Sequence, residues 1–235
     1  FCPCGCAVAA AHDFLYFFRC HHPPARPGFA QAALDTVLRL RPNAGQTHLA
    51  KANFLYRCYL DYEKARLELA LTERALPNNS EAFELTGYID RRQGFWGESA
   101  RSLQRALKLD PRNGFLLQQI AASYQEFRQF GAMAAALDRA LEITPRDLDA
   151  RVSRSQVELE WRADTRPLHQ TIAAILVEDP NSASDLADQW LYVSLCEHDR
   201  AAAARAVAAI PAVGISTDLN FSRSYCAALA ARARG

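Results

Sequence analysis

The apolar residues of this chain recur at helical spacing in pairs of segments, and the pairs themselves repeat. Three windows of 34 residues, 46–79, 80–113 and 114–147, share one layout of apolar and polar positions. The 17th position of each window is aromatic and the 24th is leucine: Tyr62, Trp96, Phe130 and Leu69, Leu103, Leu137. These positions are seven apart, so they fall on one helical face and predict a buried seam. The fixed period predicts a row of helix hairpins.

Small residues, prolines and capping residues mark the joints of each hairpin. Proline recurs at positions 42, 77, 111, 145, 180 and 211, and it ends a helix because it cannot continue one. The 8th and 20th positions are mostly small, which lets paired helices approach to about 8–10 Å. These residues are Asn53, Gly87, Ala121 and Ala65, Ser99, Met133. Side chains just after the prolines are expected to cap the next helix: Asn79, Asn113, Asp147 and Asn181.

This pattern resembles the tetratricopeptide repeat. The matching residues in the window 80–113 are Phe83, Gly87, Gly94, Trp96, Ser99, Leu103, Ala106 and Pro111. The resemblance implies an all-α fold, a right-handed superhelical solenoid of about six antiparallel helix hairpins with a C-terminal capping helix. It implies little about function, because repeats of this family serve many partners.

The same pattern predicts the domain organisation. Residues 1–27 form a Cys/His-rich segment, expected to hold the first helix of a degenerate repeat, Ala7 to Arg19, and a proline-rich connector. The repeat array covers 28–211, with weaker units at 148–181 and 182–211 after the three clear ones. Residues 212–235 form a loop and a capping helix at about 219–233. Because the chain starts at Phe1, we expect it to be part of a longer protein or a processed product.

Charge and composition argue against two classes of partner. The chain has 27 basic and 26 acidic residues, and this balance is not typical of a nucleic-acid or anionic-membrane binder. No apolar run reaches about 18 residues, so no membrane span is predicted. A helical-repeat RNA-binding protein is an alternative, because such proteins have a repeat of similar length. The basic groove of such proteins, and the polar residues that recur at fixed positions of their repeats, are not seen in this sequence. The odd count of seven cysteines favours reduced thiols and a cytoplasmic location.

The start of the chain raises a second alternative, a metal-binding protein. Its thiols and imidazoles are dense enough to hold zinc: Cys2, Cys4, Cys6, Cys20, His21 and His22. The one-residue gaps between the first three cysteines do not suit one tetrahedron, and we expect neither a native metal nor any other cofactor. We also expect no enzyme activity. His48, His169 and His198 lie in separate hairpins, and Glu158 and Glu160 are two apart on a helix and do not share a face.

The resemblance implies a concave groove lined by the first helix of each hairpin. Its candidate peptide-binding residues are Lys51, Phe54, Arg57, Glu84, Tyr88, Arg91, Arg92, Phe115, Gln118 and Gln125. Aromatic rings, guanidinium groups and amides suit an extended peptide, although an ordinary solvated helix face has a similar composition. We therefore predict a protein-interaction scaffold with a protein or peptide partner. The stretch from 164 to 199 is similar to repeat regions of multi-domain bacterial signalling proteins, which implies a regulatory role. The oligomeric state is left open.

Overall fold

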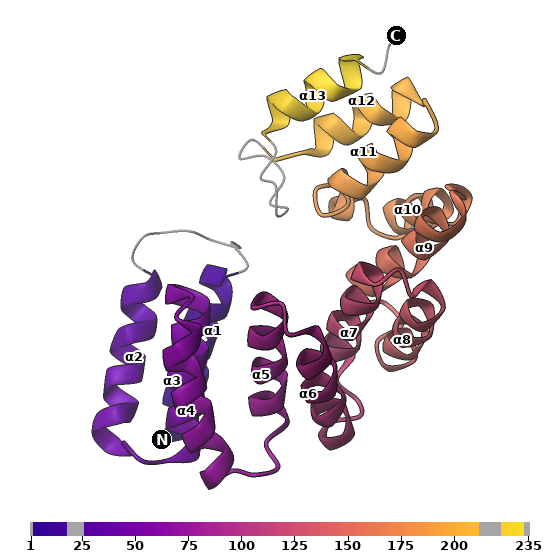
Figure 1. Ribbon diagram of the computed structural model, residues 1–235. Helices are drawn as coiled ribbons and strands as arrows, with labels where there is room; N and C mark the ends of the chain where they lie inside the picture. Colours follow the sequence, from indigo (N-terminus) through magenta and orange to yellow (C-terminus); the bar gives the residue numbers. More distant parts are fainter. Residues whose placement is uncertain (1, 18–25, 212–221, 233–235) are drawn as a thin grey trace. The chain divides into compact units, whose positions relative to one another are not determined.

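Every regular element that the structure describes is a helix. The structure is a computed structural model and describes residues 2–17, 26–211 and 222–232, without the side chains of Cys2, Pro3 and Arg26 (Figure 1). The α-helices are α1 (Cys2–Phe17), α2 (Arg26–Leu40), α3 (Gly45–Phe54), α4 (Tyr62–Ala75), α5 (Ser80–Arg92), α6 (Trp96–Leu109), α7 (Gly114–Glu126), α8 (Phe130–Ile143), α9 (Leu148–Arg162), α10 (Arg166–Glu178), α11 (Ala187–Cys196), α12 (Arg200–Ala209) and α13 (Arg223–Arg232). A π-helix, η1 (Leu55–Tyr59), follows α3, and a 3₁₀-helix, η2 (Pro180–Ala183), follows α10.

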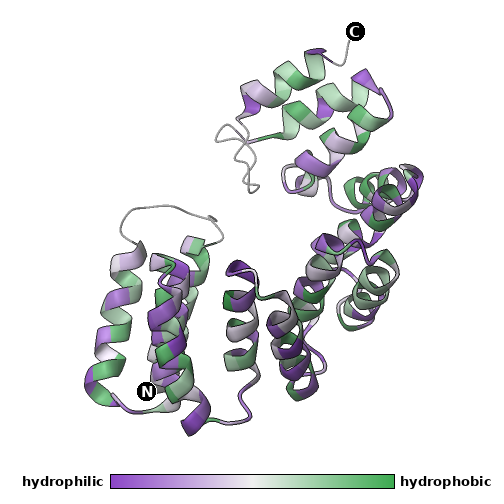
Figure 2. Ribbon diagram, in the orientation of Figure 1, coloured by the Kyte–Doolittle hydropathy of each residue, from purple (hydrophilic) through white to green (hydrophobic). Residues whose placement is uncertain are grey.

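The chain divides into two units, unit 1 at 1–116 and unit 2 at 117–235. Each unit is a series of helix hairpins, and most helices carry both apolar and polar residues along their length (Figure 2). This mixture is expected of helices with one buried face. No described helix is long and apolar enough to cross a membrane.

The pair α5 and α6 shows how the repeat sequence makes a hairpin. Asn79 caps α5, since its Oδ1 accepts a hydrogen bond from the Ala82 amide at 2.8 Å. Gly94 turns the chain with a φ of +82°, a conformation that glycine adopts without strain. The helices then meet at Gly87, whose carbonyl accepts a 2.8 Å hydrogen bond from the Ser99 hydroxyl. A Cβ at Gly87 would lie 2.7 Å from a Leu103 methyl carbon, so the small residue predicted there is required by packing.

In unit 1 the first two helices form a hairpin against the third. Helix α1 packs against α2, α3 and η1. The shared core contains Ala9, Ala30, Leu34, Ala50 and Phe54. Helix α1 begins at Cys2, earlier than the predicted start at Ala7. The predicted end at Arg19 lies outside the described residues.

Unit 2 continues the pattern and ends in the capping helix. Helix α9 takes part in two successive hydrophobic clusters. Its Val157 belongs to the cluster that includes residues of α8, and its Val152 belongs to the cluster that includes residues of α10. Helix α13 packs on α12, and the buried Cys226 joins the last core cluster. The described part of the capping helix runs over 223–232, and both ends of the predicted span 219–233 lie outside the described residues.

The sixth hairpin departs from the predicted cap. Asn181 does not cap α11, because the chain forms η2 at this point. The Asp179 carboxylate accepts the Asn181 amide hydrogen bond at 3.0 Å and caps η2 instead. Helix α11 then begins at Ala187 without a side-chain cap.

Candidate interaction surface

The candidate surface in unit 1 is built where α1 meets η1, α5 and the first turn of α7. Arg57 on η1 places its guanidinium 5.4 Å from the ring centre of Phe14 on α1. Arg92 on α5 lies 5.6 Å from the ring of Phe17, and Phe115 on α7 meets the Phe14 ring edge to face at 6.4 Å. We call these five residues, Phe14, Phe17, Arg57, Arg92 and Phe115, the aromatic–arginine surface.

A buried ion pair anchors this surface. Asp13 on α1 is wholly buried, and its carboxylate accepts a hydrogen bond from the Arg57 guanidinium at 2.7 Å. Burial raises the pKa of Asp13 to about 6, although the Arg57 charge opposes this shift. Asp13 Oδ2 and His12 Nδ1 are buried without a hydrogen-bond partner in the described part of the chain. Arg57 is thus held by a carboxylate and lies over the ring of Phe14.

The outer members of the surface are open to a partner. Phe14 and Phe115 are 37% and 40% exposed, and Arg92 is also exposed. Guanidinium groups within about 6 Å of aromatic rings are attracted to the ring faces, which keeps both side chains ordered without burying them. The surface therefore combines apolar contact area with forked hydrogen-bond donors.

Four of the predicted groove residues in unit 1 are not part of this surface. Phe54 is only 3% exposed, because the α1–α2 hairpin covers it. Lys51 binds Glu68 on α4 at 2.6 Å, within its own hairpin. Tyr88 is 8% exposed and donates its hydroxyl to Glu84 at 2.6 Å, and burial raises the pKa of both groups. Their roles in the structure are core packing and internal pairing.

The remaining predicted residues divide between the two units. Arg91 places its guanidinium 5.4 Å from the Tyr88 ring, next to Arg92 in unit 1. Gln118 and Gln125 belong to unit 2, where both link α7 to the next hairpin. Gln118 donates to Asp147 at 3.3 Å, and Gln125 donates to Glu160 at 2.6 Å.

Sequence reasoning did not identify Asp13, Phe14 or Phe17 as parts of a site. They lie in the segment 1–27, whose repeat pattern is too weak to place each residue on a face. The sequence feature that could have indicated this site is Asp13, which lies next to the apolar run that begins at Phe14. A charged residue at a buried helical position requires a partner.

The structure also bears on the alternative chemistries. The described residues contain no group of three or more His, Cys, Asp or Glu side chains able to hold a metal ion, and Cys20, His21 and His22 lie outside them. Cys6 packs against the core of unit 1 and donates weakly to the Gln46 carbonyl at 3.6 Å. Glu158 faces Arg154 and Arg162, and Glu160 accepts from two glutamines, so these carboxylates have separate partners.

Comparison with known proteins identifies the fold. No protein-family model matches the chain, and no curated protein matches it. Among solved structures, pilF of Pseudomonas aeruginosa is similar with a TM-score of 0.63 and 14% identity, over 88% of this chain and 90% of that one. A tetratricopeptide repeat protein of Parabacteroides merdae gives 0.59 and 14%, over 87% and 77%. YrrB, described as a TPR protein with an unusual peptide-binding site, gives 0.57 and 16%, over 86% and 97%. The chain therefore has a tetratricopeptide-repeat fold.

Proposed function

We propose that this chain, which has the fold of tetratricopeptide-repeat proteins, is a non-catalytic interaction scaffold that binds a peptide segment of a partner protein. The binding site is the aromatic–arginine surface of unit 1. The observation that carries this proposal is the cluster of rings and guanidinium groups on this surface: Arg57 lies over Phe14, Arg92 lies over Phe17, and Phe115 meets the Phe14 ring. Aromatic and arginine side chains are the residue types that contribute most to protein–protein binding.

The chemistry of the surface indicates the chemistry of the peptide. Phe14 and Phe115 offer apolar area to an apolar or aromatic side chain. Arg92 offers a forked donor, which suits a carboxylate or a backbone carbonyl. Arg57 is already bound to Asp13, so Arg92 is the expected anchor for a negative charge. YrrB, which shares the fold, is described as having a peptide-binding site, and this supports a peptide ligand here by analogy.

A peptide selection on the purified chain tests this proposal. Peptides selected from a random display library are expected to be enriched in acidic and aromatic residues. The double variant Arg92→Glu with Phe115→Ala is expected to weaken their binding at least about tenfold, a loss of about 1.4 kcal/mol. Both side chains are exposed, so the variant is expected to fold.

The matched control is Arg101→Glu with Phe95→Ala, which changes the same residue types at exposed positions elsewhere in unit 1. This control is expected to retain wild-type affinity. The proposal is wrong if the selected peptides bind the Arg92 and Phe115 variant as tightly as they bind the control.

We further propose that the scaffold is the regulatory part of a larger cytoplasmic signalling protein of bacteria. The support is the similarity of residues 164–199 to repeat regions of such proteins. The reading frame around this chain tests the idea: a kinase, cyclase or winged-helix domain upstream would support it, and an unrelated metabolic enzyme there would contradict it.

A further inference from the structure

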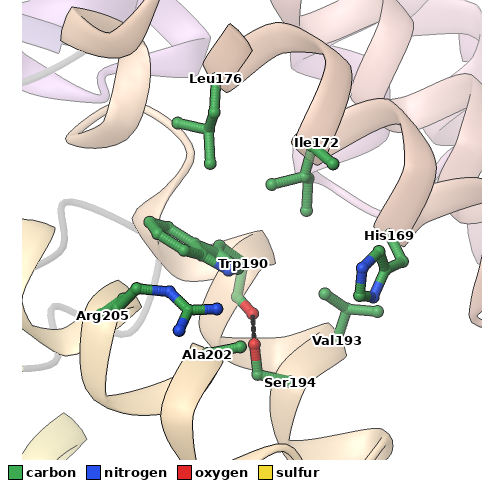
Figure 3. Close-up of a pocket in the computed structure, with 9 residues that line it drawn as sticks. His169, Ile172, Leu176, Trp190, Val193, Ser194, Ala202 and Arg205 are labelled. Carbon is green, nitrogen blue, oxygen red and sulfur yellow. Dashed lines mark hydrogen bonds between the residues drawn. The ribbon is translucent and has the colours of Figure 1, made fainter.

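Unit 2 contains a cavity of about 310 Å³ between α10, α11 and α12 (Figure 3). Ile172 and Leu176 of α10 form one wall, facing Trp190 and Val193 of α11. Ala202 and Arg205 of α12 line the third side, with Ala173 and His169 of α10 also at the edge. All of these helices belong to unit 2, whereas the aromatic–arginine surface belongs to unit 1.

The sequence explains why this space is left open. Helix α12 presents small side chains here, since Ala202, Ala203 and Ala206 are its buried residues. The corresponding second helix α8 buries Met133 and Leu137. In addition, η2 lengthens the connection between α10 and α11, which have few contacts with each other. Alanine side chains next to a widened connection leave a gap that Ile172 and Leu176 do not fill.

The walls of the cavity are chemically apolar. The Ser194 hydroxyl, which lines it, donates to the Trp190 carbonyl at 2.7 Å (Figure 3). Its only hydrogen-bond donor is therefore used inside α11. Ile172 and Val193 are each 2% exposed, so the wall that they form belongs to the core of unit 2. Such a wall favours an apolar group over water.

One edge of the cavity carries a positive charge. The Arg205 guanidinium lies 6.0 Å from the ring centre of Trp190, and no carboxylate pairs with it within the described ranges. At the other edge, the His169 ring is bound to Glu197 at 2.7 Å, so that carboxylate already has a partner. A ligand that enters the cavity thus meets apolar walls, an indole and one available cation.

We propose that this cavity is a second peptide-docking site, which takes a short segment of a partner protein with an apolar side chain next to an acidic one. A leucine- or phenylalanine-sized side chain fills the space between Leu176 and Trp190. The neighbouring aspartate or glutamate binds the Arg205 guanidinium, which suits a carboxylate in a two-point contact. The volume is at the lower end of the range for small-ligand pockets, which fits one side chain and not a whole helix.

Two-dimensional NMR of the labelled chain tests this site with defined probes. The probe is a hexapeptide of glycine and serine that carries one phenylalanine followed by one aspartate. The matched peptides replace the phenylalanine with alanine or the aspartate with asparagine. The indole N–H signal of Trp190, assigned with Trp190→Phe among the three tryptophans, reports on the cavity. The expected Kd of the probe is about 0.1–1 mM, because one side chain and one ion pair make the contact.

Substitutions at two lining residues, each with a control, separate the parts of the proposal. Ala173→Phe adds a ring at an exposed cavity edge and is expected to abolish the Trp190 shift, whereas Ala174→Phe, at the next exposed position of α10, is the matched control. Arg205→Glu is expected to weaken the probe at least about tenfold, and Arg205→Lys to keep part of the affinity. Unchanged binding of the aspartate-free peptide would overturn the acidic contact. A lack of saturable Trp190 shifts with every peptide, or shifts that persist in Ala173→Phe, would overturn the site.

The experiments on the cavity and on the aromatic–arginine surface can fail independently of each other. The substitutions at Arg92 and Phe115 in unit 1 are expected to leave the Trp190 titration unchanged. Conversely, Ala173→Phe is expected to leave the display-selected peptides of unit 1 bound.

Discussion

Arg57 and Asp13 form an ion pair of 2.7 Å between η1 and α1, and the carboxylate of this pair has no exposed surface. Only one of its two oxygens has a hydrogen-bond partner among the described residues. A buried carboxylate with one partner is poorly compensated for the loss of water, which is why burial raises its pKa to about 6 despite the adjacent arginine.

This pKa makes the stability of unit 1 depend on pH in an unusual direction for a carboxylate. The folded-state pKa of about 6 lies above the ordinary value of 3.8, so between these pH values the folded state holds a proton that the unfolded state has released. The contribution of Asp13 is fully present below about pH 4 and is lost as pH rises through about 6. We expect the free energy of unfolding of the wild type, minus that of Asp13→Asn, to fall by about 2–3 kcal/mol between pH 4 and pH 7.

Urea unfolding at four pH values between 4 and 7 measures this difference. Asp61→Asn is the control with the opposite sign, because hydrogen bonds from Lys64 lower the pKa of Asp61. The corresponding difference for Asp61 is expected to rise with pH. A difference for Asp13 that is constant or rises would show that this carboxylate is not destabilised by burial.

Gly87 is required by close packing of the helices in the hairpin of α5 and α6. A Cβ at this position would lie 2.7 Å from two side-chain carbons of Leu103 and 3.3 Å from its backbone nitrogen. Because the backbone cannot move away as a flexible side chain can, Gly87→Ala is expected to lower the free energy of unfolding by about 1–3 kcal/mol. Thermal unfolding by circular dichroism measures the effect.

Gly97→Ala provides the contrast to Gly87→Ala. Gly97 lies in α6, where an added Cβ would meet nothing nearer than an Arg101 nitrogen at 3.8 Å. Alanine there is expected to stabilise the helix by about 0.5–1 kcal/mol, since glycine has the higher backbone entropy when unfolded. Equal effects at the two positions would contradict the packing argument.

The sequence predicted the hairpins well because their contacts repeat. Gly87 and Ser99 meet where small residues were predicted to let the helices approach. Asn79, which follows a repeat proline, caps the next helix as predicted. The candidate site was predicted less well. Phe54 was placed on a surface by its window position, but its exposure depends on the packing of a different hairpin, α1 and α2, whose own repeat pattern is weak.

The repeat pattern also did not predict the irregular segments of the chain. The π-helix η1 carries Arg57 and therefore decides where this guanidinium points, yet no residue type marks it in the sequence. Likewise η2 displaces the cap predicted at Asn181. A repeat pattern predicts which residues are equivalent, and local backbone geometry then decides which equivalents keep the same contacts.

The turn at Ala163 stores backbone strain that glycine would relieve. Ala163 ends α9 in the left-handed conformation, with a φ of +57°, and its side chain is exposed. This conformation costs a residue with a Cβ about 1–2 kcal/mol, partly offset by the entropy of glycine in the unfolded chain. Ala163→Gly is expected to raise the free energy of unfolding by about 0.5–1 kcal/mol.

Denaturant unfolding compares this variant with Ala135→Gly. Ala135 is also exposed in unit 2 but lies within α8, where glycine is expected to destabilise by about 1 kcal/mol. The opposite signs of the two substitutions identify the effect as conformational. Destabilisation by both would mean that the turn at Ala163 tolerates alanine without strain.

The cap at Asn79 is expected to stabilise α5 in a way that Asn181 cannot reproduce for α11. The Asn79 side chain accepts the Ala82 amide, which otherwise has no partner in the helix. Asn79→Ala is expected to lower the free energy of unfolding by about 1 kcal/mol and to speed hydrogen exchange at the first-turn amides of α5. Asn181 follows a repeat proline too, but its side chain only donates to the exposed Asp179. Asn181→Ala is therefore expected to change stability by less than about 0.5 kcal/mol and to leave the α11 amides unaffected. Of these two residues, Asn79 alone accepts a hydrogen bond from a helix amide. Similar effects of the two substitutions on amide exchange would therefore contradict the role of Asn79 as a cap.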